Sequence, residues 1–220
     1  MKIPTSDKLL SEGKIKQAME WSYEKAVNGV AGLGTAIELA ENYMETNDSP
    51  IKQADSLIRW QITKAGTTGF VTGLGGLVTM PVTVPVNIAS VLYVQIRMIA
   101  AIAHIGGHDL SDDRIKTLVY VCLVGNGARE VIQETGIIIS KNLTKGAIKA
   151  IPGKSLIAIN KKVGFRLLTK FGEKGAVNLG KVVPVAGGIV GFAVDAVTTK
   201  LIGKVAKNVF ITEDCDESNS

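Results

Sequence analysis

The chain has 220 residues, of which 46% are hydrophobic and 20% charged, a balance that excludes a disordered chain and allows one substantial core or two small ones. Only 5% of the residues are aromatic while 24 are glycine, so the apolar bulk is aliphatic and small, as in closely packed helices. The net charge of +5 favours phosphate-bearing partners, and two cysteines, Cys122 and Cys215, exclude a disulfide framework. We interpret both cysteines as free thiols of a reducing compartment, which predicts a cytoplasmic location.

The positive charge is concentrated in one third of the chain. Residues 141–207 contain thirteen Lys and Arg against only Glu173 and Asp195, a net charge of +11. Residues 208–220 carry four acids and no base, a net charge of −4. A cationic block of this kind attracts the phosphates of lipids or nucleic acids over a screening length of about 8 Å at physiological salt.

The N-terminal quarter predicts a flexible start followed by three helical pieces. Residues 1–14 are expected to be flexible. Apolar spacing predicts a helix over 15–46 that is interrupted at 31–34, with Thr35 or Gly34 starting its second piece. Ser49 is predicted to be the N-cap of a helix over 51–64, with Pro50 in the first helical position.

The next segment, residues 65–96, contains no charged residue and is long enough to cross a bilayer. Its first part, 66–85, is interrupted by several glycines and two prolines, which would leave backbone groups unpaired in lipid. We therefore expect two close-packed helical segments inside the protein. Small residues four apart, Gly69/Gly73 here and Gly187/Gly191 later, are interpreted as points where helix backbones approach closely.

The remaining chain also has helical periodicity. A helix over 86–104 carries Ser90, Arg97 and His104 in one line along an otherwise apolar cylinder. Further helices are expected over 112–124 with Ser111 as cap, 128–150, 156–171 with Ser155 as cap, and 185–210. The predicted fold is all-α: a single compact multi-helix domain over 15–210 with glycine-mediated close packing, no significant sheet, and a disordered acidic tail over 211–220.

Several unusual blocks carry a family resemblance. They are, in order, GGLVTMPVTVP at 75–85, LYVQIRMIAA at 92–101, GGHDL at 106–110, KVGFRLLTKFG at 162–172 and NLGKVVPVAGG at 178–188. With these blocks the sequence resembles the EcsC protein family from about residue 21 to 210. The resemblance implies a cytoplasmic or membrane-associated bacterial protein and supplies no catalytic residue.

Three rows of basic residues form the strongest functional signal. Each row is spaced by three or four residues, so its members share one helix face: Lys141, Lys145, Lys149; Lys162, Arg166, Lys170; and Lys200, Lys204, Lys207. Three basic faces on successive helices suit contact with anionic headgroups, provided that they gather on one exterior surface. An ordinary solvated face is the alternative, although acids are nearly absent from these segments.

The other patterns point to structure rather than chemistry. Arg97 and Asp195 are isolated charges in apolar helices and are predicted to form a buried ion pair, the alternative being that each pairs locally or faces water. His104, His108 and Asp109 are metal-ligating residue types, but Gly106 and Gly107 interrupt their helical spacing, and no metal is predicted. Fragments of glycine-rich nucleotide motifs at 73–76 and 153–155 are incomplete, so no cofactor is predicted.

The sequence therefore favours a non-enzymatic helical module that associates peripherally with an anionic membrane surface or lipid, with a protein partner also open. Nucleic-acid binding by the same basic rows is the alternative, disfavoured by the scarcity of interleaved aromatics. An enzyme acting on a lipid or small molecule is a third hypothesis, for which no nucleophile, base and orienting group can be assembled.

Overall fold

The computed structural model describes residues 10–65 without 31 and 47, residue 84, and residues 86–137, 144–171 and 187–211; it leaves out the side chains of 64–65, 86–87 and 187–195. Within these ranges the protein is all-α, as predicted, and an isolated bridge between Val30 and Leu33 is the only β pairing. The helices are α1 (Glu12–Asn28), α2 (Ala36–Met44), α3 (Pro50–Ala65), α5 (Val86–Ile105), α6 (Asp113–Cys122), the 3-10 turn η3 (Gly125–Gly127), α7 (Ala128–Gln133), α8 (Lys145–Lys149), α9 (Gly153–Phe171) and α11 (Gly187–Phe210).

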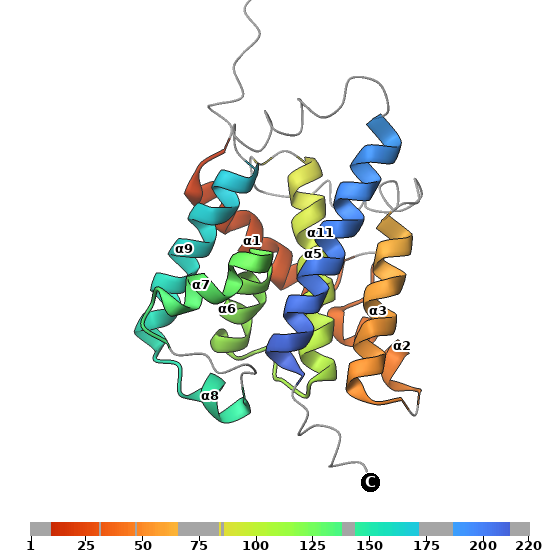
Figure 1. The fold of residues 1–220 in the computed structure, drawn as a ribbon, viewed down its shortest axis with the longest axis horizontal. Coiled ribbons are helices and arrows are strands. Elements are labelled where there is room, and N and C mark those ends of the chain that lie inside the picture. Colours follow the sequence, from red (N-terminus) through yellow and green to blue (C-terminus); the bar gives the residue numbers. More distant parts are fainter. Residues whose placement is uncertain are drawn as a thin grey trace, which may run out of the picture.

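Helix α5 lies at the centre of the described structure. Helices α1, α2, α3, α6 and α11 all pack against it. Figure 1 shows α7, α8 and α9 on one side of this centre and α2 and α3 on the other. Helix α6 contacts both α9 and α11, so the two C-terminal basic helices are joined to the core through a common neighbour.

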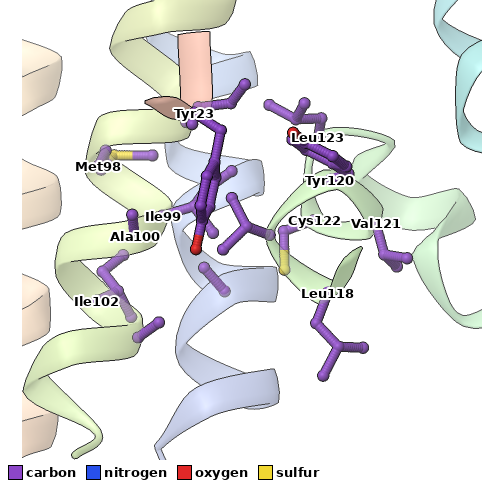
Figure 2. Close-up of a cluster of buried hydrophobic side chains, with 14 of the residues drawn as sticks. Tyr23, Met98, Ile99, Ala100, Ile102, Leu118, Tyr120, Val121, Cys122 and Leu123 are labelled. Carbon is purple, nitrogen blue, oxygen red and sulfur yellow. The ribbon is translucent and has the colours of Figure 1, made fainter. Parts of the chain in front are cut away.

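The core is filled from α5, α6 and α1. Figure 2 shows aliphatic side chains of α5 facing those of α6, with the ring of Tyr23 from α1 among them. The Tyr23 hydroxyl donates a hydrogen bond of 2.7 Å to the carbonyl oxygen of Leu110, and its ring meets Tyr120 edge to face at 5.8 Å. Burial raises the pKa of Tyr23, Tyr120 and the Cys122 thiol, so all three are neutral and serve as packing groups.

The polar line along α5 is only partly covered by the neighbouring helices. Ser90, Arg97 and His104 are each half-buried, while most of the other described side chains of the helix are buried. Residues 88–105 are long and apolar enough to cross a bilayer, but 67% of this stretch is buried inside the protein. Packing at the centre of a helical core accounts for that apolar character.

The break predicted within 15–46 is present. Helix α1 ends at Asn28 with Gly29 as its C-cap, and both Gly29 (φ 86°) and Gly32 (φ 81°) adopt backbone angles that favour glycine. Helix α2 then starts with a capping box, in which the Thr35 hydroxyl accepts from the Glu38 amide and the Glu38 carboxylate accepts from the Thr35 amide. The amides of Thr35 and Glu38, which have no partner within the helix itself, are hydrogen-bonded locally. This fixes the start of the second helix.

Two predicted caps were wrong. Asp112, not Ser111, caps α6 through the amide of Arg114, while Ser111 donates to Asp109. A carboxylate at this position is favoured by the helix dipole as well as by the hydrogen bond. Helix α9 starts at Gly153 rather than after Ser155, and the Ser155 amide donates to the carbonyl oxygen of Pro152 instead of Ser155 acting as the cap.

The single helix predicted over 128–150 is also wrong. Helix α7 ends at Gln133, and a turn follows that contains Gly136 at φ 78°. A separate short helix, α8, begins after Thr144, whose hydroxyl accepts from the Ala147 amide. An apolar repeat that continues across a glycine therefore does not ensure a continuous helix.

The boundaries of the domain are wider than predicted. Helix α1 begins at Glu12, with Ser11 as its cap, inside the stretch predicted to be flexible. Ile211, the first residue assigned to the tail, is 6% exposed and belongs to the core. Three predictions concern residues outside the described ranges. They are the flexible start over residues 1–9, the close backbone approach at Gly69/Gly73, and the disordered tail over residues 212–220.

Candidate functional site

The predicted basic rows lie on three helices. On α8, Lys145 and Lys149 are exposed; on α9, Lys162 and Arg166 are half-buried and Lys170 is exposed; on α11, Lys200 and Lys204 are exposed and Lys207 is half-buried. Lys141 lies outside the described residues. Helices α9 and α11 lie on different sides of α6 (Figure 1). The rows on these two helices therefore occupy separate parts of the surface. The expectation that all three rows gather on one exterior surface does not hold for α9 and α11.

Acids from elsewhere in the chain neutralise part of the row on α9. Lys162 binds Glu134 at 2.7 Å, and Arg166 binds Glu130 and Glu134 at 3.1 Å each. The hydrogen bond from Lys162 holds the pKa of the Glu134 carboxyl below its usual range, with Arg166 adding to the effect. These glutamates belong to α7 and the turn at its C-terminal end. Because they lie outside residues 141–207, the scarcity of acids within that range gave no indication that the basic row is paired.

The row on α11 has one internal partner among the described residues. Lys207 binds Asp55 of α3 at 2.6 Å, and its side chain is only 23% exposed. The pair joins two neighbouring helices near the C-terminal end of α11. Lys207 is therefore a packing residue, whereas Lys200 and Lys204 remain exposed to solvent.

A different face of α9 points to solvent. Ile159, Val163 and Leu167 are buried. Ile157 and Phe165 are 76% and 62% exposed. We call the solvent-exposed set Lys154, Ile157, Ala158, Lys161, Phe165 and Thr169 the outer face of α9.

Sequence reasoning missed this outer face, although its spacing was readable. Ile157 and Phe165 are eight residues apart, and Lys154 and Lys161 are seven apart, so the four share one side of a helix. What the sequence could not supply was the orientation of α9. Contact with α1 and α6 decides which of its two partly apolar sides is buried.

A groove runs beside the outer face of α9. Its volume is about 790 Å³, within the usual range of ligand pockets. Its walls come from the first turn of α1, the end of α7 and the solvent side of α9, and they are formed by Glu12, Glu134, Ala158, Lys161, Lys162, Phe165, Arg166 and Thr169. Apolar and charged side chains of both signs therefore meet in one place.

Comparison with known proteins identifies the family. The profile of the EcsC protein family matches residues 6–212, nearly the whole chain. The chain belongs to the EcsC protein family. No curated protein and no solved structure matches the sequence. The EcsC assignment agrees with the sequence resemblance and extends it at both ends.

The second polar feature of this EcsC protein surrounds Arg97. Its guanidinium donates to the carbonyl oxygen of Thr35 at 3.3 Å, and its Nε is buried with no hydrogen-bond partner among the described residues. Burial lowers the pKa of Arg97, and the nearby Glu38 carboxylate opposes that shift. An open hollow of about 550 Å³ is lined by residues between Asn28 and Glu38, including the Thr35 that Arg97 contacts. The side chain of Asp195, the predicted partner, lies outside the described residues.

The residues of metal-ligating type in this EcsC protein make other contacts. His108 is buried, and its Nε2 lies 2.9 Å from the carbonyl oxygen of Phe210, the last residue of α11. Asp109 accepts from the amide and hydroxyl of Ser111, and His104 is half-buried on α5. In the ranges that the structure describes, no three His, Cys, Asp or Glu side chains converge in a way that could hold a metal ion.

Proposed function

We propose that this EcsC protein attaches peripherally to anionic membrane surfaces through the outer face of α9. The observation that carries the proposal is the exposure of Ile157 and Phe165 on the same helix side as Lys154 and Lys161. An interfacial helix needs both an apolar side that enters the headgroup region and lysines that meet the lipid phosphates.

The magnitudes fit reversible binding. Each lysine near an anionic surface contributes about 1 kcal/mol, and two exposed lysines, Lys154 and Lys161, belong to the outer face of α9. Full burial of an Ile or Phe side chain contributes about 1.5–3 kcal/mol. Association has its own cost in lost freedom, so the surplus corresponds to weak, salt-sensitive attachment.

Lys162 and Arg166 have a smaller share in the proposed contact than their spacing in the sequence predicts. Their charges are already met by Glu130 and Glu134, and moving them to lipid phosphates leaves those carboxylates beside an anionic surface. Lys200 and Lys204 lie on α11, away from the outer face of α9. They supply the matched control.

Vesicle flotation tests the proposal. The wild-type protein should float with vesicles of phosphatidylglycerol and phosphatidylcholine, not with phosphatidylcholine alone, and added salt should release it. Lys154→Gln/Lys161→Gln should weaken binding about 30-fold, which is two lysines at about 1 kcal/mol each. Ile157→Ser/Phe165→Ser should weaken it at least as much, and circular dichroism should show an unchanged helix content for both variants.

The matched control is Lys200→Gln/Lys204→Gln, which removes the same charge from α11. Its vesicle binding should remain close to that of the wild type. Equal losses in the α9 and α11 variants would show non-specific charge attraction and overturn the assignment to α9. Tight binding to an oligonucleotide, lost in Lys154→Gln/Lys161→Gln but insensitive to Ile157→Ser/Phe165→Ser, would favour a nucleic-acid partner instead.

A further inference from the structure

The groove beside the outer face of α9 contains two opposite charges that the described protein leaves unpaired. Lys162 and Arg166 pair with Glu134 and Glu130. Glu12 and Lys161 line the same groove, and neither side chain has a hydrogen bond or an ion pair within the described ranges. Among the described residues, internal pairing leaves one carboxylate and one ammonium group available to a ligand.

The place of Glu12 follows from the start of α1. Ser11 caps the helix, and an acid in its first turn is favoured by the helix dipole. The side chain then lies against Gly164 of α9, where a Cβ would come to 3.5 Å from the Glu12 Cγ. Glu12 is half-buried at this junction, so its carboxylate is held at the groove wall rather than extended into solvent.

An acid at this position is unfavourable if the surface meets only anionic lipid. A phosphatidylglycerol headgroup satisfies Lys161 but repels Glu12, and closing the surface over an unpaired carboxylate costs free energy. A ligand that carries both an ammonium group and a phosphate satisfies both side chains. Phe165 and Ala158, in the same wall, supply an apolar boundary for the glycerol and upper acyl region.

We propose that the groove binds the headgroup of phosphatidylethanolamine, with the ammonium group on Glu12 and the phosphate on Lys161. The inference rests on the proposed membrane attachment and names the lipid for which the site is selective. A primary ammonium donates hydrogen bonds to a carboxylate, and such charge-assisted bonds are the stronger ones. The quaternary ammonium of phosphatidylcholine has no N–H to donate, so the groove discriminates between the two headgroups.

The test uses vesicles with a constant share of phosphatidylglycerol and a remainder of either phosphatidylcholine or phosphatidylethanolamine. The full-length protein should bind the phosphatidylethanolamine vesicles up to about tenfold more tightly. Glu12→Gln should abolish this preference while binding to the phosphatidylglycerol–phosphatidylcholine vesicles is kept. The matched control, Glu41→Gln, removes an exposed acid from α2 on the other side of α5 and should keep the preference.

Each outcome has a separate meaning. A preference that persists in Glu12→Gln indicates lipid packing rather than headgroup recognition and overturns the inference. Equal binding to both vesicle types by the wild type overturns it as well, while leaving membrane attachment intact. Loss of all vesicle binding in the wild type defeats the proposed function itself. Saturable binding of soluble phosphoethanolamine that vesicles do not compete away would make the ligand a free zwitterion and overturn the assignment to a lipid.

Discussion

Helices α9 and α11 carry similar rows of basic residues but are held in place in different ways. Helix α11 is fitted closely: Gly203 lies against Ile58 of α3, Lys207 binds Asp55, and Phe210 is held by His108. Helix α9 meets α1 more loosely and gains part of its anchoring from surface ion pairs with α7. The two basic rows look alike in the sequence. The row of α11 belongs to a closely packed helix, whereas the row of α9 belongs to a helix whose outer face is exposed to solvent.

The difference teaches that charge spacing alone does not separate a structural helix from a binding helix. Both helices expose apolar groups, since Val197 of α11 is 68% exposed. Only α9 combines an exposed aromatic residue, exposed lysines and an adjacent groove among the described side chains. These surroundings come from other parts of the chain.

The largest expected effect concerns the end of α11. A Cβ at Gly106 would collide with the carbonyl oxygen of Phe210, and backbone cannot move aside as a side chain can. Gly106→Ala should therefore cost about 3 kcal/mol of unfolding free energy, a fall in Tm of about 6–12 °C for a chain of this size. Thermal unfolding followed by circular dichroism measures it. Gly13→Ala, whose Cβ would meet only the Ser11 hydroxyl at an ordinary 3.9 Å, is the control, and equal stability of the two variants would contradict the close fit.

A second pair of glycines compares the two helices directly. A Cβ at Gly203 of α11 would come to 2.7 Å from Cγ1 of Ile58, whereas one at Gly164 of α9 has ordinary contacts. Gly203→Ala should cost about 1–2 kcal/mol after its gain in helix propensity, and Gly164→Ala should gain up to about 1 kcal/mol. Urea unfolding of both variants measures these changes. A loss of unfolding free energy in Gly203→Ala and a gain in Gly164→Ala would support the difference in packing between α11 and α9. A stabilising Gly203→Ala would contradict it.

A smaller effect is expected from pH. Burial lowers the pKa of His108 below 6.5, partly opposed by its hydrogen bond to Phe210, and Lys145 lowers it further. The unfolded chain therefore takes up a proton at higher pH than the native state does. The stability from neutral His108 is complete above about pH 6.5 and is lost as the pH falls below that value.

Urea unfolding midpoints measured at about pH 7.5 and about pH 5, on either side of the ordinary pKa of histidine, test the effect. His108→Gln keeps an N–H donor for Phe210 and removes the titration, so its midpoint should fall less than that of the wild type. His104→Gln leaves His108 in place and serves as the control. An unchanged pH dependence in His108→Gln would show that other groups cause it.

The smallest effect concerns the ion pairs of α9. Lys162 and Arg166 lower the pKa of Glu134, so the stabilisation by the ion pairs is present above the ordinary pKa of glutamate and is lost as the pH falls through the lowered one. Lys162→Gln/Arg166→Gln should return the Glu134 titration to the usual range, as followed by NMR. Lys200→Gln, on α11, should leave it unchanged. Global stability should change little because the pairs are exposed.

Local signals determined the fold class and most helices. Helical periodicity marked α5 and its polar line of Ser90, Arg97 and His104, and residues 31–34 with Thr35 marked the break between α1 and α2. Such features act within one or two turns of the chain, so neighbouring residues suffice to predict them.

Only the tertiary structure decided which charges are neutralised and which apolar residues remain outside. Glu134 is 28 residues from Lys162, and Asp55 is 152 residues from Lys207, so no local spacing relates them. The rotation of α9, which exposes Phe165 and buries Val163, depends on the shapes of α1 and α6. The sequence by itself determined how much positive charge the C-terminal third carries, whereas packing between distant segments decided where that charge is available, because ion pairing and burial depend on proximity in space.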